Sequence, residues 1–192
     1  MATFNKEGRL KRGLARATSV AGFAIIALAA GAALLPAEKG ISSDVLGALL
    51  LAAGLIEMVA GALRRETRIL AMGAGGITAV AGLMFLLNSD ARFFPTVNIV
   101  IGWLFLRAVA LGVTSAQVHE SGIRRWTIIA AGTDFALGLI MLIGLSLSTA
   151  VVLIFGPTPE IVASFAWVLA LSFVATGTLL LEVASCEREA AS

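Results

Sequence analysis

The sequence predicts an all-α integral membrane protein with six transmembrane helices. Charged residues make up only 14% of its 192 residues, against about 25% in soluble domains, and the mean hydropathy is +0.98. Six apolar stretches of roughly 20 residues are each long enough to cross ~30 Å of hydrocarbon at ~1.5 Å per residue. A soluble fold could not bury this much apolar surface, whereas a lipid bilayer solvates it.

Short polar or basic segments separate the predicted spans. The basic segment 1–16 is expected to lie along the membrane surface, with a signal peptide as the competing interpretation. The apolar residues 151–155 allow the fifth span to run long or to re-enter the interface. A short cytoplasmic tail, 186–192, ends the chain. The six spans are expected at about 17–35, 45–63, 69–87, 97–117, 126–147 and 161–185.

Lysine and arginine are distributed unevenly between the two predicted sides of the membrane. From the amino terminus, the seven segments outside the spans carry 5, 1, 3, 1, 2, 0 and 1 of these residues, so alternate segments hold eleven against two. Cytoplasmic segments of membrane proteins are enriched in lysine and arginine. We therefore expect both termini in the cytoplasm.

Glycines recur at similar places in the odd-numbered spans. Gly31, Gly82 and Gly138 occupy corresponding positions in the first, third and fifth spans, and the segments 76–82 and 132–138 each begin and end with glycine. This recurrence predicts three repeats of a helical hairpin.

A second set of glycines, in and before the second span, follows a seven-residue period: Gly40, Gly47, Gly54 and Gly61. Seven residues make nearly two helical turns, so these glycines form one smooth stripe along which helix backbones can approach closely. Glu57 borders the stripe and should face protein. We predict that Gly47, Gly54 and Gly61 pack helices together.

Three charged residues lie deep inside the predicted spans: Glu57, Arg107 and Asp134. An arginine near the bilayer centre costs roughly 3 kcal/mol or more unless it is compensated. The helical rise places the carboxylates about 9 and 12 Å, and the arginine about 15 Å, from the cytoplasmic ends of their spans. We predict that Arg107 pairs with Asp134, with Glu57 nearby. Gly138, one turn beyond Asp134, is a further predicted packing position, and a cation–π contact from Trp103 to Arg107 is sterically allowed.

These three charges allow two interpretations. Intramembrane carboxylates often serve proton or ion relays, but a neutralising ion cluster inside a helix bundle also accounts for the pattern. We favour the structural cluster, because transporters usually carry more polar residues along their path and broken helices near the midplane.

Other chemistry is sparse. Cys186 and His119 are the single cysteine and histidine, which predicts no metal site within the chain, and no nucleophile–base pair or phosphate loop is recognisable. His119 is expected to be an interfacial loop residue, with a haem or pigment ligand as the alternative. The sequence therefore predicts no enzyme and no cofactor. The basic residues flank spans, so no nucleic-acid partner is expected.

The chain resembles the HdeD-like family of small bacterial inner-membrane proteins. Residues 47–57 (GALLLAAGLIE) are similar to the family's G-x-x-L-L-x-x-G-x-x-E run, and 102–107 (GWLFLR) and 132–140 (GTDFALGLI) resemble its later elements. The chain departs from the family where Asn88-Ser89 replaces a frequent Asn-Pro, and the sixth span lacks the second glycine-to-acid pattern. The resemblance implies three hairpin repeats in the bacterial inner membrane and a role in acid or envelope stress. It implies no catalytic residues.

The leading hypothesis is therefore a non-enzymatic membrane protein that acts through helix packing and association with copies of itself or other membrane chains, in contact with membrane lipids. One alternative is a small transporter or proton-conducting protein that uses Glu57, Arg107 and Asp134. Another is an accessory subunit of a larger membrane complex.

Overall fold

The chain folds into long helices joined by short connections. The computed structural model describes residues 2–34, 43–64, 67–87, 93–155 and 159–189, and the side chains of 13–34, 44–64, 67–87, 97–144 and 167–189. Each helix of this described part contains a segment long and apolar enough to cross a membrane, which is consistent with an integral membrane protein. The helices are α1 (Ala2–Ala33), α2 (Ser43–Ala62), α3 (Arg68–Leu87), α4 (Phe93–Gln117), α5 (Ser121–Phe155) and α6 (Pro159–Glu189).

Three helices extend beyond the predicted spans. The first span and the basic segment before it form one continuous helix, α1, which starts at Ala2. Helix α5 continues through the apolar residues 151–155 to Phe155, beyond its candidate span Ser121–Gly144, and both expectations for this segment stay predictions. Helix α6 likewise continues past the predicted span end to Glu189, into the expected tail. In each case no proline interrupts the helix, and backbone hydrogen bonding continues past the apolar stretch.

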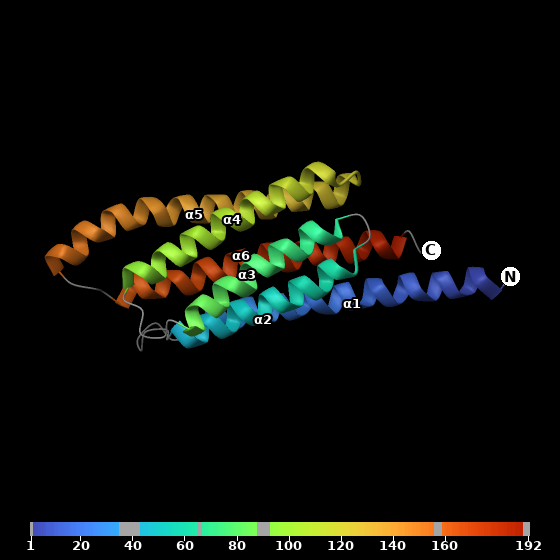
Figure 1. Ribbon diagram of the computed structural model, residues 1–192, viewed down its shortest axis with the longest axis horizontal. Coiled ribbons are helices and arrows are strands. Elements are labelled where there is room, and N and C mark those ends of the chain that lie inside the picture. Colours follow the sequence, from blue (N-terminus) through green and yellow to red (C-terminus); the bar gives the residue numbers. More distant parts are fainter. Residues whose placement is uncertain (1, 35–42, 65–66, 88–92, 156–158, 190–192) are drawn as a thin grey trace.

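The helices form a ring in which each packs on the next along the chain and α6 returns to α1 (Figure 1). The two ends of the described chain consequently lie at the same end of the bundle, which we call the terminal end. The most extensive contacts join α2 with α3, α1 with α6 and α4 with α5. The expected hairpins pair the helices differently (α1 with α2, α3 with α4, α5 with α6), and the threefold repeat stays a prediction.

Glycines explain why α2 and α3 approach so closely. A Cβ atom at Gly47 would lie 2.9 Å from the carbonyl oxygen of Gly82, and one at Gly61 would lie 2.7 Å from the backbone nitrogen of Met72. A Cβ at Gly54 would likewise meet the α3 backbone, 2.8 Å from the carbonyl oxygen of Gly75. Backbone therefore packs on backbone along this interface, as small residues permit in membrane helices.

The remaining predicted packing glycine serves a looser contact. A Cβ at Gly138 in α5 would lie 3.4 Å from Leu104 and Phe105 of α4, which is the shortest distance of an ordinary van der Waals contact. Gly22 of α1 and Gly177 of α6, which the sequence did not single out, form a closer one, because a Cβ at Gly22 would lie 3.0 Å from the Gly177 carbonyl oxygen. Gly40 lies outside the described residues.

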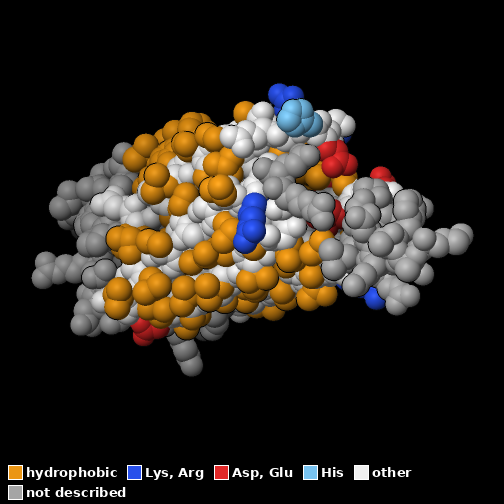
Figure 2. Space-filling model, turned by 45° about the vertical axis from the view of Figure 1, so that its right-hand side comes forward, with side chains coloured by type: hydrophobic (Ala, Val, Ile, Leu, Met, Phe, Trp, Pro, Cys, Tyr) orange, Lys and Arg blue, Asp and Glu red, His pale blue; other side chains and the backbone are white. Residues whose placement is uncertain are grey.

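Large apolar side chains cover the outside of the bundle as well as its core. Many valine, leucine and isoleucine side chains on all six helices are exposed, and Figure 2 shows hydrophobic side chains spread over the side of the molecule. A water-soluble monomer rarely exposes so much contiguous apolar surface. The interior by contrast holds several polar side chains, and these define the candidate site.

Candidate buried ion-pair site

Arg107 of α4 lies at the centre of the bundle and is the largest fully buried side chain among the described residues, at 1% exposure. Asp134 of α5 is 0% exposed and Glu57 of α2 is 7% exposed. All three side chains face the interior of the bundle, where they contact side chains of other helices. The sequence anticipated this burial for both carboxylates.

The structure brings the three charges together. The Arg107 Nη1 atom forms an ion pair with Asp134 Oδ2, and Nη2 forms one with Glu57 Oε1 at 3.0 Å. The predicted pairing of Arg107 with Asp134 is therefore present, and Glu57 is a direct partner of the arginine rather than only a neighbour. Charge-assisted hydrogen bonds of this kind are among the stronger interactions available to a buried arginine.

Two hydroxyl groups of α6 provide the remaining acceptors for the Nη groups, whereas the Arg107 Nε is buried without a hydrogen-bond partner in the described structure. Arg107 Nη1 donates to Ser172 Oγ at 3.1 Å, and Nη2 donates to Thr176 Oγ1. Ser172 Oγ in turn donates to Asp134 Oδ1 at 2.6 Å, and Thr176 Oγ1 donates to the Ser172 carbonyl oxygen at 2.8 Å. Each Nη nitrogen thus has two acceptors for its two N–H groups.

Sequence reasoning missed Ser172 and Thr176. They are four residues apart, so they lie on one face of α6, one turn above the other. That spacing inside an apolar helix was the available signal. With them the site brings side chains from three other helices, namely α2, α5 and α6, to Arg107 of α4.

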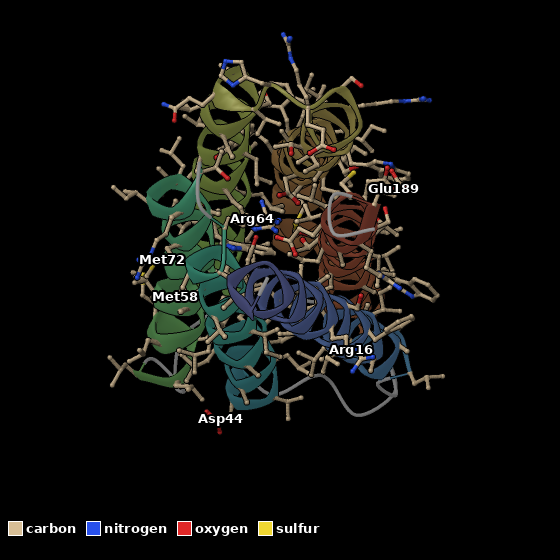
Figure 3. All side chains as sticks on the ribbon, turned by 90° about the vertical axis from the view of Figure 1, so that its right-hand side faces the viewer. Arg16, Asp44, Met58, Arg64, Met72 and Glu189 are labelled. Atoms are coloured by element: carbon tan, nitrogen blue, oxygen red, sulfur yellow. The ribbon has the colours of Figure 1, made fainter. Side chains whose placement is uncertain are left out.

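A further basic residue, Arg64, lies between this site and the terminal end of the bundle. Figure 3 shows Arg64 among the helices, unlike Arg16, which points outward. Burial lowers the pKa of the Arg64 guanidinium, while the negative charges of Glu57 and Glu187 raise it. The cluster of one arginine and two carboxylates carries an excess negative charge when all three are ionised, and Arg64 offsets it.

A small cavity connects Arg64 with the ion cluster. Its polar lining consists of Glu57, Arg64, Thr114 and Thr176, and residues of α3, α4 and α6 supply its apolar wall. About 10 Å³ is open to the centre of a water molecule, which is room for about one water. The Nε atom of Arg64 is buried without a hydrogen-bond partner in the described structure, so a water molecule here would have a donor and acceptors to bind.

Trp103 contributes a second polar contact one turn before Arg107. Its Nε1–H donates to Thr78 Oγ1 at 3.1 Å, and Thr78 donates to the Ala74 carbonyl oxygen at 3.2 Å. This joins α3 to α4 and satisfies the buried indole nitrogen. The indole ring of Trp103 is therefore positioned by a hydrogen bond to α3.

The described residues contain no group of three or more histidine, cysteine or acidic side chains able to hold a metal ion. His119 is exposed, in the connection between α4 and α5. The free Cys186 is half-buried near the end of α6.

Fold and site together define a six-helix protein of membrane-spanning character with a buried arginine–carboxylate cluster. No family model matches the chain, and no curated protein or solved structure is similar to it. The resemblance to the HdeD-like family accordingly stays a prediction.

Proposed function

We propose that the protein is a non-enzymatic integral membrane protein in which the ion cluster holds the helix bundle together. The observation that supports this is the full occupation of both Nη groups of Arg107, whose Nε alone is buried without a partner among the described residues. All four of its Nη hydrogens have acceptors, on Asp134, Ser172, Glu57 and Thr176. A guanidinium whose Nη groups are fully occupied by three other helices has little left to offer a substrate, and it connects those helices strongly.

The wider role follows the sequence resemblance. We propose an HdeD-like protein of the bacterial inner membrane, built from three hairpin repeats with both termini cytoplasmic, that acts in acid or envelope stress by associating with copies of itself or with other membrane chains. The excess of lysine and arginine on one side and the apolar exterior of the bundle support it. Purification in mild detergent tests the association, and a chain that is always isolated alone and monomeric would contradict it.

A double-mutant cycle tests the structural role of the cluster. Removing Arg107 as Arg107→Ala leaves two buried carboxylates without a counter-ion, which typically costs about 3–5 kcal/mol. Asp134→Ala should also destabilise the protein, and the two changes should be non-additive because they remove the same ion pair. Thermal unfolding in detergent measures both effects. Simple additivity, or unchanged stability of Arg107→Ala, would contradict the proposal.

A charge-free variant separates loss of charge balance from loss of packing. Replacing the cluster as Glu57→Gln, Arg107→Met and Asp134→Asn removes every buried charge at similar volume. Because buried ion pairs often contribute little compared with neutral groups of matching shape, this triple variant should be more stable than Arg107→Ala. If it is equally unstable, packing rather than charge balance decides the stability.

A second candidate function, proton conduction, has a specific observation in its favour. The cavity between Arg64 and Glu57 offers a place for a water molecule beside a buried carboxylate, and such carboxylates often carry protons in membranes. Liposomes with an internal pH-sensitive dye would report it. Robust proton flux that Asp134→Asn abolishes, in a variant that still folds, would favour conduction over the purely structural role.

A further inference from the structure

A shallow hollow lies at the terminal end of the bundle, where α4 passes into α5. It has a volume of about 570 Å³ and is lined by His119, Ser121, Arg124, Arg125, Ile128 and Ile129. Its lining is basic and polar at one side and apolar at the other. No part of the ion cluster or of the cavity beside Arg64 contributes to it.

Within the described part of the chain, no carboxylate forms an ion pair with the two arginines of this hollow. Neither Arg124 nor Arg125 forms an ion pair with any residue that the structure describes. The described ion pairs all belong to Arg107. Two acidic side chains lie close to this part of the chain, but neither lines the hollow. Glu120 is exposed in the connection before α5, and a carboxylate oxygen of Glu182 on α6 lies 3.3 Å from the Cβ position of Gly122. The hollow therefore presents positive charge to its occupant.

The apolar side of the hollow continues into the membrane-spanning part of α5. Ile128 and Ile129 are 51% and 41% exposed, and each follows one of the arginines by four residues, so that it lies one helical turn deeper. Figure 2 shows the histidine with a basic side chain beside it at the upper edge of the molecule, and hydrophobic side chains over much of the rest of this face. This arrangement matches a molecule with an anionic head and an apolar tail.

We propose that the hollow binds an anionic phospholipid, with its phosphate group on His119, Arg124 and Arg125 and an acyl chain along Ile128 and Ile129. The guanidinium groups are suited to phosphate oxygens because of their planar set of donors. A free phosphate ion would use the basic side but would gain nothing from the exposed isoleucines. The two halves of the hollow together therefore favour a lipid.

A lipid titration of the purified full-length protein tests the site. Native mass spectrometry in detergent would give the affinity for phosphatidylglycerol, with phosphatidylcholine as the neutral comparison. The double variant Arg124→Gln and Arg125→Gln should bind phosphatidylglycerol roughly tenfold or more weakly, because two charge-assisted contacts are lost. Nine lysine and arginine residues remain on the terminal side against two opposite, so the topology should be preserved.

Two further measurements make the site specific. Arg68→Gln is the matched control, because Arg68 is an exposed arginine at the start of α3, at the same end of the bundle but outside the hollow. It should leave the affinity unchanged. The double variant Ile128→Ser and Ile129→Ser should weaken binding of long-chain phosphatidylglycerol without changing that of glycerol phosphate.

Several results would overturn the proposal. Equal affinities for the two lipids would show that the negative charge of the headgroup does not contribute to binding. An equal loss of affinity in Arg68→Gln would show diffuse electrostatic attraction instead of a site. Displacement of phosphatidylglycerol by millimolar inorganic phosphate, with no effect of the isoleucine changes, would reassign the hollow to a free anion.

Discussion

The contribution of a buried arginine to the stability of the protein depends on each of its hydrogen bonds. At Arg107 the two carboxylates balance the charge, but they account for only two of the four Nη hydrogens. Ser172 and Thr176 accept the other two. A buried donor left without a partner costs about 1–3 kcal/mol, so the hydroxyl groups of α6 matter for stability even though they carry no charge.

Thr176→Val should therefore destabilise the protein by about 1–3 kcal/mol, because it keeps the shape of the side chain and leaves one Arg107 N–H unsatisfied. Thr178→Val, two residues away on the same helix, is the control. Thr178 bonds only to backbone carbonyls of its own helix, so its replacement should change stability little. Unfolding midpoints in detergent measure both, and equal effects of the two changes would contradict the role of Thr176.

The residues of the site were unequally predictable for a physical reason. An unpaired charge is so costly in a membrane that Arg107 and Asp134 each need a counter-ion, and few other charged residues lie within the spans. A hydroxyl group has no such requirement, since it can bond to its own helix backbone. Thr114 and Thr127 do so. The sequence therefore did not distinguish Thr176, which also binds the arginine, from threonines that serve only their own helix.

Between elements, the stability of the bundle depends on how closely α2 and α3 can approach. Gly54→Ala should destabilise the protein by about 1–3 kcal/mol, because the added methyl group meets the α3 backbone, which cannot yield as a flexible side chain does. Gly73→Ala on α3 should be neutral or stabilising by up to ~1 kcal/mol, since nothing lies within 4 Å of its Cβ position. Denaturant titrations compare the two variants. Similar losses in both would mean that glycine matters here only through helix propensity.

The partner of the glycine stripe was harder to predict than the stripe itself. The seven-residue period in α2 showed that another backbone approaches, but α1 and α3 were both adjacent along the chain. Gly75 and Gly82 of α3 repeat the same seven-residue spacing and lie opposite Gly54 and Gly47. The seven-residue spacing shared by the two helices was present in the sequence and could have identified α3 as the partner. The hairpin interpretation used a different spacing, the six residues from Gly76 to Gly82.

At the scale of the whole molecule, the ring of helices explains how one chain can neutralise a charge at its centre. Because α6 returns to α1 while also packing on α5, residues 57, 107, 134 and 172 come from separate helices and meet at one point. Length and hydropathy predicted the six helices, since each has to match the same membrane thickness. They did not predict the order of packing, because lipid-facing and helix-facing apolar residues look alike in a sequence.

The orientation of this ring in the membrane can be tested at the ends of two helices. Asp44 and Ser121 are both exposed and lie at opposite ends of the bundle, near the starts of α2 and α5. In a Cys186→Ser background, Asp44→Cys and Ser121→Cys each provide a single thiol.

A membrane-impermeant maleimide added to intact bacterial spheroplasts should label the cysteine at position 44 and leave that at position 121 unlabelled. The expected cause is the excess of lysine and arginine at the terminal end, which retains that end in the cytoplasm. Both positions should react after the membrane is disrupted, which controls for intrinsic reactivity. The reverse pattern would place both termini outside the cytoplasm. It would also move the hollow at Arg124 and Arg125 to the outer leaflet, where the positive charge would meet a different set of lipid headgroups.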